Sequence, residues 1–87
     1  MAPTARDFEA ELEREFATAQ QEGRASVEVN AGKLHQQIGA YPGRDHRMPV
    51  CCRVMRSHLR AGLDEIVDSP PSGQGASLTI RYRLPRP

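Results

Sequence analysis

The chain has no tryptophan and only two tyrosines and two phenylalanines, which leaves few large rings to fill an interior. A core must therefore rely mainly on leucine, isoleucine, valine, methionine and alanine. The length of 87 residues allows one domain with a modest core, since a chain of this size buries only about 60% of the surface that it exposes when unfolded. We expect no second domain.

Long apolar runs are also absent. No stretch approaches the ~20 apolar residues that span a bilayer, and the acidic N-terminal region lacks the features of a signal peptide. The only two cysteines, Cys51 and Cys52, are adjacent, whereas a small secreted domain carries several spaced cysteines. Adjacent positions on a helix point about 100° apart, which disfavours an unstrained disulfide. We expect reduced thiols, no membrane partner and a cytoplasmic protein.

The cysteines have three alternative roles. Cys51 is predicted to be a small core residue. Cys52 lies beside Arg53 near a predicted helix start, and both features lower a thiol pKa, which makes Cys52 a candidate redox-sensitive residue. Four residues of this region could in principle bind a metal ion: His46, Cys51, Cys52 and His58. Their spacing is not that of a zinc module. We therefore predict no metal and no other cofactor.

Motifs that would indicate an enzyme are missing. The sequence contains no glycine-rich phosphate loop and no convincing Ser/His/Asp spacing. The one carboxylate near the polar side chains of Tyr41, His46 and Arg47 is Asp45, so a metal-binding acidic pair for phosphodiester cleavage is lacking. We expect no enzymatic activity and no catalytic residues.

Charge is unevenly distributed along the chain, although the net charge is only +1. Residues 1–43 hold four basic and seven acidic side chains, whereas residues 44–87 hold eight arginines and four carboxylates. Eleven of the twelve basic residues are arginine, whose planar fork of donors suits phosphates and guanine edges. A GC-rich genome would also favour arginine, but it would not explain the clustering. The C-terminal half is therefore the candidate nucleic-acid side.

The N-terminal segment is predicted to be an amphipathic helix over about residues 5–22. Thr4 and Asp7 fit a capping box, and Gly23 stands where a helix would end. A narrow apolar stripe recurs at helical spacing, formed by Phe8, Leu12, Phe16 and Ala19. A narrow stripe packs on one surface only, so residues 1–24 are expected to lie either on the body of the domain or on a second copy in a homodimer.

A short strand and a short helix are expected next. Residues 26–29 alternate in polarity, Asn30 is a good N-cap, and residues 31–38 give two helical turns that stop at Gly39. The outer side of this helix is expected to carry His35, Gln36 and Gln37.

A basic helix is predicted over about residues 48–60, after a turn signal at residues 41–43. The connection brings Arg44, His46 and Arg47 to the start of this helix, where backbone N–H groups attract phosphate. The solvent side of the helix has three arginines and no carboxylate, and it is predicted to consist of Cys52, Arg53, Arg56, Ser57 and Arg60.

A hairpin is predicted at the C-terminal end, with strands over residues 63–68 and 77–84. Either Ile66 or Val67 is expected to face inward. The connection over residues 69–76 is too long for a tight turn, and its small residues are typical of a wing that approaches phosphates. The second strand alternates between a buried face and an exposed one, the latter formed by Thr79, Arg81 and Arg83. We expect this exposed face and the solvent side of the basic helix to point the same way.

The order of these elements over about residues 26–85 resembles the winged helix-turn-helix superfamily. The resemblance implies an α+β fold in which residues 25–87 form the winged domain. It implies binding of duplex DNA, with residues 49–60 in the major groove and residues 69–76 near the adjacent backbone or minor groove.

On this interpretation the chain is a small DNA-binding protein, either a transcriptional regulator or an accessory factor in DNA processing. Arg44 and Arg47 are expected on phosphates, and Arg53 and Arg56 on base edges. The full set of expected DNA-binding residues is Arg44, His46, Arg47, Arg53, Arg56, Ser57, Arg60, Thr79, Arg81 and Arg83. The alternative is a winged-helix adaptor that binds another protein and no DNA, because a fold does not settle a function.

Overall fold

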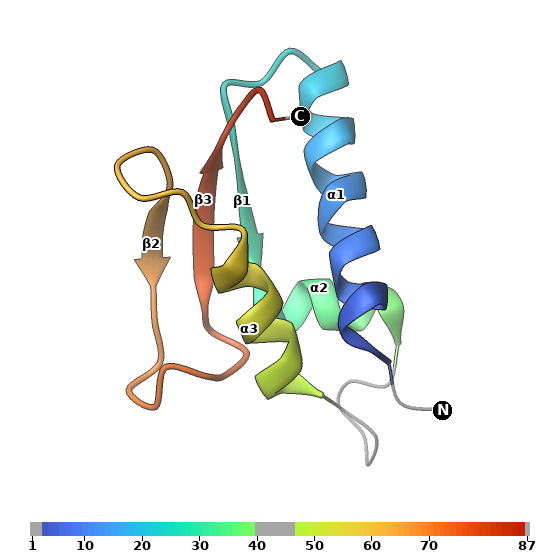
Figure 1. The fold of residues 1–87 in the computed structure, drawn as a ribbon, viewed down its shortest axis with the longest axis vertical. Helices are drawn as coiled ribbons and strands as arrows, with labels where there is room; N and C mark the ends of the chain where they lie inside the picture. Colours follow the sequence, from blue (N-terminus) through green and yellow to red (C-terminus); the bar gives the residue numbers. More distant parts are fainter. Residues whose placement is uncertain (1–2, 40–46, 87) are drawn as a thin grey trace.

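The computed structural model describes residues 3–39 and 47–86, and it combines three helices with a three-stranded antiparallel sheet (Figure 1). The elements, in chain order, are α1 (Ala5–Gln21), β1 (Ser26–Asn30), α2 (Ala31–Ile38), α3 (Met48–Ser57), β2 (Glu65–Asp68) and β3 (Thr79–Arg83). The expected α+β class is confirmed, and the order of elements is compatible with that of a winged helix. None of the described helices is long and apolar enough to cross a membrane.

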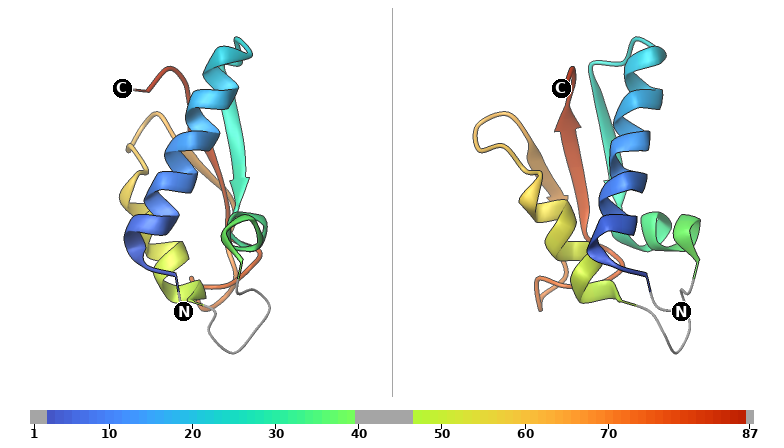
Figure 2. Two further views of the ribbon diagram at one scale, coloured as in Figure 1. Left: turned by 90° about the vertical axis from the view of Figure 1, so that its right-hand side faces the viewer. Right: turned by 45° about the vertical axis from the view of Figure 1, so that its right-hand side comes forward.

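Helix α1 has the predicted cap and the predicted apolar stripe. The Thr4 side chain accepts the N–H of Asp7, and the Asp7 carboxylate accepts the N–H of Thr4, which completes a capping box. Gly23 follows the helix with a φ of 75°, a left-handed conformation that glycine adopts readily. The stripe is buried within the same chain and consists of Phe8, Leu12, Phe16 and Ala19. Helix α1 lies beside α3 on one side of the sheet (Figure 2).

The start of α2 is joined to the chain segment that leads into β3. Asn30 caps the helix as predicted, because its side chain accepts the backbone N–H three residues on at 3.1 Å. The N–H groups of Ala31 and Gly32 donate to the carbonyls of Leu78 and Ala76 at 2.8 and 3.1 Å. A Cβ at position 32 would lie 3.1 Å from the Cβ of Ala76, a tight contact that a larger residue could adopt only if its neighbours shifted by a few tenths of an ångström.

His35 is entirely buried, which contradicts its expected place on the outer side of α2. Its Nε2 accepts the backbone N–H of Arg47 at 2.8 Å, so the ring proton lies on Nδ1, which donates to the carbonyl of Gly39 at 3.1 Å. The Phe8 ring meets it edge-on at a centroid distance of 4.9 Å. His35 therefore ties the end of α2 to the start of α3. The two glutamines that follow it are exposed as expected.

Strand β3 is the centre of the sheet, whose strand order is β1-β3-β2. The predicted alternation is confirmed, because one face of this segment is buried and consists of Leu78, Ile80, Tyr82 and Leu84. The hydroxyl of Tyr82 donates to the carbonyl of Met55 in α3 at 2.7 Å, and its ring meets Phe16 of α1 at 4.9 Å. A single side chain of β3 thus contacts both long helices.

Strand β2 is short and lies at an edge of the sheet (Figure 1). The expectation that Ile66 or Val67 faces inward is met by Ile66, which lies opposite the buried Ile80 and so faces the helical side of the sheet. Ile66 and Val67 are nevertheless 38% and 44% exposed. The register shifts between Ile66 and Asp68, which leaves Val67 as the extra residue of a bulge. No helix among the described residues covers this strand, which accounts for the exposure.

The Asp64 carboxylate joins the segment that follows α3 to the end of β3 and to the C-terminal tail. Its two oxygens accept the backbone N–H groups of Arg60 and Arg83, each at 2.7 Å. The Arg86 guanidinium donates to both oxygens at 3.0 Å and lies over the Phe16 ring at 4.8 Å. The Asp64 side chain is completely buried, and that of Arg86 is 7% exposed. The end of α3, the end of β3 and the C-terminal tail are therefore held by one anion.

Two opposing effects set the pKa of the Asp64 carboxyl. Burial raises the pKa, but the hydrogen bonds from the backbone N–H groups of Arg83 and Arg60 and from the Arg86 side chain stabilise the carboxylate more. The resulting pKa lies below the ordinary value of 3.8.

We predict that Asp64→Asn lowers the free energy of unfolding by about 3 kcal/mol at neutral pH, because it leaves the Arg86 guanidinium buried without its anion. Urea denaturation followed by circular dichroism measures this loss. A carboxyl with a lowered folded-state pKa stabilises the fold above its unfolded-state pKa and loses that contribution as the pH falls through the folded value. The difference between wild type and variant should therefore shrink below about pH 4. A difference that stays constant down to strongly acidic pH would contradict this role.

Candidate nucleic-acid interface

The exposed face of α3 is a stripe at four-residue spacing formed by Pro49, Arg53 and Ser57. The opposite face is buried and consists of Met48, Cys51, Cys52, Val54 and Met55. The expectation that Cys52 lies on the solvent side of this helix is therefore wrong. The helix ends at Ser57, three residues before the expected end. No carboxylate occurs in the sequence from Arg47 to Arg60, so this face is free of negative side chains of its own.

Two arginines of this region have side chains that are open to a ligand. Arg53 is exposed, and among the described residues nothing forms a hydrogen bond or an ion pair with it. Arg47 is the exposed N-cap residue of α3; its backbone is held by His35, and its side chain makes no cap hydrogen bond. Both guanidinium groups belong to the start and the middle of one helix, so they can approach the same ligand.

Arg56 has a different role, because its guanidinium holds the connection between β2 and β3. It donates to the carbonyl of Gly73 at 2.9 Å and to the hydroxyl of Ser69 at 3.3 Å. The sulfur of Cys52 adds a second attachment, accepting the N–H of Gly75 at 3.4 Å and lying 3.5 Å from its carbonyl oxygen. The connection, predicted to be a wing, is therefore attached along the flank of α3, at the end of the molecule where α3 begins (Figure 1).

Both cysteines are free and entirely buried, so the expectation of unpaired thiols is confirmed. Burial raises the pKa of Cys51 to about 12. Burial also raises the pKa of Cys52, and it outweighs the lowering by the Gly75 hydrogen bond and the Arg56 charge. Cys52 is therefore wrong as a candidate low-pKa, redox-sensitive thiol. In the part of the chain that the structure describes, no group of three or more potential ligands could hold a metal ion.

Ser57 and Arg60, two further predicted DNA contacts, are already bonded within the protein. The Ser57 hydroxyl donates to the carbonyl of Val54 at 2.7 Å, and the Arg60 guanidinium donates to the carbonyl of Arg83 at 2.7 Å. Arg44 and His46 lie outside the described residues and stay predictions.

The strand residues of the predicted interface are separated from α3 by the sheet. Thr79, Arg81 and Arg83 alternate with Ile80 and Tyr82, whose side chains are buried on the helical side. The three outer residues therefore point away from the helices. The expectation that they share a direction with the solvent side of α3 is wrong.

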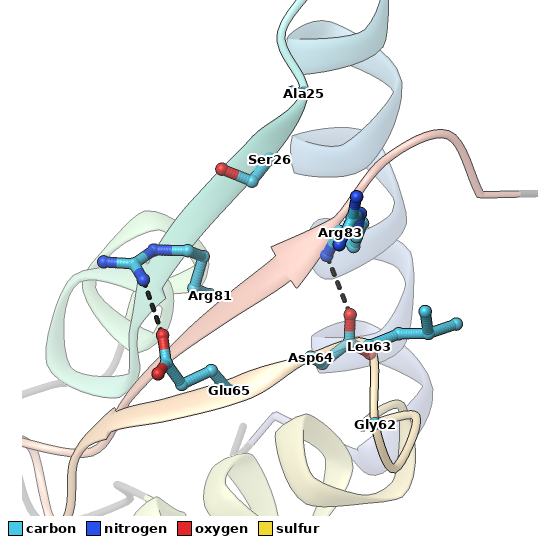
Figure 3. Close-up of a pocket in the computed structure, with 8 residues that line it drawn as sticks. All are labelled: Ala25, Ser26, Gly62, Leu63, Asp64, Glu65, Arg81 and Arg83. Atoms are coloured by element: carbon cyan, nitrogen blue, oxygen red, sulfur yellow. Dashed lines mark hydrogen bonds and ion pairs between the residues drawn. The ribbon is translucent and has the colours of Figure 1, made fainter.

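Arg81 is also engaged by carboxylates on both neighbouring strands, and Figure 3 shows its contact with Glu65. Its guanidinium lies 2.8 Å from Glu28 of β1 and 2.5 Å from Glu65 of β2. Thr79 accepts a hydrogen bond from Asn30 and donates to the carbonyl of Ser77, which leaves it in a local network.

His35 is the positioning residue that the sequence interpretation missed. It sets the start of α3 through the backbone of Arg47, although it belongs to another helix. The sequence did hold a signal for this burial, because His35 follows the apolar Leu34 on a helix of only two turns. A short helix packed against two neighbouring helices can bury side chains on more than one side.

We predict that Arg56→Ala loosens the connection between β2 and β3, whereas Arg53→Ala does not. The first variant removes two hydrogen bonds to Ser69 and Gly73, so it should accelerate amide hydrogen exchange at Gly75 and cost about 1 kcal/mol of unfolding free energy. Arg53→Ala removes the same charge from the same helix and is the matched control. Equal exchange rates in the two variants would show that Arg56 does not hold the connection.

We also predict that iodoacetamide labels neither thiol of the native protein within the time that fully labels a free cysteine. Burial and the raised pKa of both groups keep the reactive thiolate scarce and inaccessible. Mass spectrometry should show labelling at Cys51 and Cys52 only after unfolding in urea. Rapid native labelling of Cys52 would restore the redox hypothesis.

Comparisons of the chain with models of protein families, with curated proteins and with solved structures found no significant match. The function is therefore inferred from the charge and geometry of the surface described above.

Proposed function

We propose that the chain is a winged-helix domain that binds duplex DNA by laying α3 into the major groove. The observation that carries this proposal is the exposed face of α3, with Arg53 at its centre and no carboxylate in the sequence from Arg47 to Arg60. The major groove admits an α-helix, and an arginine fork can reach both acceptors of guanine or a phosphate. We propose a biological role as a transcriptional regulator or as an accessory factor in DNA processing.

The arrangement of elements supports the winged-helix assignment. Helices α2 and α3 follow one another, and the hairpin of β2 and β3 comes next in the chain. In that scheme α3 has the place of the recognition helix. The attachment of the β2–β3 connection by Arg56 and Cys52 keeps this wing beside the helix, at the side from which DNA would approach.

The arginines divide their tasks on this surface. Arg53 is placed to meet base edges, and Arg47, at the start of the helix, to meet a phosphate. Arg56 acts on the wing and only indirectly on DNA. The wing segment over residues 69–76 has no basic side chain, so its part is close backbone approach and the electrostatic attraction comes from the helix. Arg81 and Arg83 are not part of this surface, because they lie beyond the sheet.

We predict that Arg53→Gln weakens binding to a mixed-sequence duplex and lowers the slope of log affinity against log salt by about 1 if Arg53 contacts a phosphate. If Arg53 reads a base, the loss should instead be about 1–3 kcal/mol on the preferred sequence. Fluorescence anisotropy over a salt series measures both quantities. Arg83→Gln is the matched control, because it removes the same charge from the opposite side of the sheet and should leave the affinity unchanged.

Two outcomes would refute the proposal. The first is wild-type protein that binds no duplex even at the lowest salt concentration. The second is an equal loss of affinity in Arg53→Gln and Arg83→Gln, which would mean that the contact depends on net charge and not on the face of α3.

A further inference from the structure

A hollow of about 560 Å³ opens on the outer face of the sheet, on the side away from the helices (Figure 3). It lies where β1 begins and β3 ends, next to the segment that leads into β2. The side chains that matter for its chemistry are Ser26, Leu63, Arg81 and Arg83.

Successive rows of the sheet differ in charge at this hollow. In one row Arg81 stands between two carboxylates, those of Glu28 and Glu65. In the next row Arg83 pairs with Ser26 on β1, and Leu63, in the turn before β2, lines the same hollow. Arg83 therefore has no carboxylate neighbour in its row, and no side chain among the described residues bonds to its guanidinium.

The carboxylate of Asp64, which also lines the hollow, does not compensate this charge. Both of its oxygens already accept hydrogen bonds from the backbone of Arg60, the backbone of Arg83 and the side chain of Arg86. The side chain is also completely buried. The hollow thus presents an unpaired cation beside a hydroxyl and an apolar side chain, and its complement is a carboxylate next to an apolar group.

The adjoining edge of the sheet is apolar and open. Leu63, Ile66 and Val67 are 51%, 38% and 44% exposed; Leu63 lies in the turn just before β2, and the other two lie on the strand. Strand β2 is paired on one side only, with β3, so its other side offers unpaired backbone N–H and C=O groups. An exposed apolar edge strand is a place where another strand can add to a sheet.

We propose that the edge of β2 and the hollow together bind an extended segment of a partner protein, which adds to the sheet as a fourth strand. The backbone of this segment pairs with β2, and its apolar side chains cover Leu63, Ile66 and Val67. An acidic side chain of the segment reaches Arg83. This surface is separate from the exposed face of α3, so the inference does not depend on DNA binding.

A second copy of the chain fits this edge less well. Antiparallel pairing of β2 with itself would place Glu65 opposite Asp68 twice, and like charges directly opposite are destabilising. Pro70, which follows shortly, has no N–H to continue the ladder. Such a dimer would also leave Arg83 without an anion. The chemistry of the edge therefore favours a segment of different sequence.

The test starts from a displayed library of random peptides selected on the full chain. Enriched peptides should carry an acidic residue, which reaches Arg83, next to β-branched apolar residues, which pair as a strand with β2. In ¹⁵N-labelled protein these peptides should shift the amide signals of residues 63–68 and 81–83. Arg83→Gln should weaken the binding by about tenfold. Leu63→Ser, a change at an exposed position that leaves the fold intact, should also weaken it.

Arg53→Gln serves as the control, since it removes an arginine from α3 and should leave peptide binding unchanged. The proposal is overturned if no peptide is enriched over an unrelated protein, or if the peptides shift signals of α3 instead. It is also overturned if Arg83→Gln binds like wild type. If the amide signals of residues 65–68 shift with protein concentration in the absence of peptide, the edge of β2 binds a second copy of the chain, and the proposal is overturned. A wild-type protein that binds peptides but no duplex DNA would contradict only the function proposed for α3.

Discussion

The buried carboxylate of Asp64 is the group on which the arrangement of the C-terminal half depends. It accepts hydrogen bonds from the end of α3, the end of β3 and the tail at the same time. Because it binds Arg83 through the backbone, the Arg83 side chain remains free on the outer face. Because it binds the N–H of Arg60, it also fixes how α3 leaves the sheet. The two proposed surfaces lie on opposite sides of the sheet, yet both are positioned by this one anion.

Most of the elements could be predicted from the sequence, because they are specified by residues close together in the chain. The Thr4 capping box, the Asn30 cap and the alternation along β3 are all local signals. The end of α3 was misplaced because apolar spacing does not show where a side-chain acceptor takes over a backbone N–H. The N–H of Arg60 bonds to the Asp64 carboxylate instead of continuing the helix. Nor could the exposure of Ile66 be predicted, since alternation reveals the face of a residue but not whether a helix covers it.

The candidate interface was only partly predictable for the same reason. Clustering and helical spacing identified the arginines of α3, but they could not show which guanidinium groups are already bonded. Arg56 is committed to residues 13 and 17 positions away, and Arg81 to a carboxylate 53 positions away. Such pairings follow from tertiary packing. The same applies to His35, whose two ring nitrogens find partners only once α2 and α3 have come together.

His35 also bears on how this fold can change over evolution or by engineering. Its two ring nitrogens hold the carbonyl of Gly39 and the N–H of Arg47, so the ends of the connection between α2 and α3 are fixed by a residue outside that connection. Lengthening a connection whose ends are already held costs little closure entropy. A change in the number of residues between Gly39 and Arg47 is therefore expected to leave both helices in place, because His35 holds their facing ends.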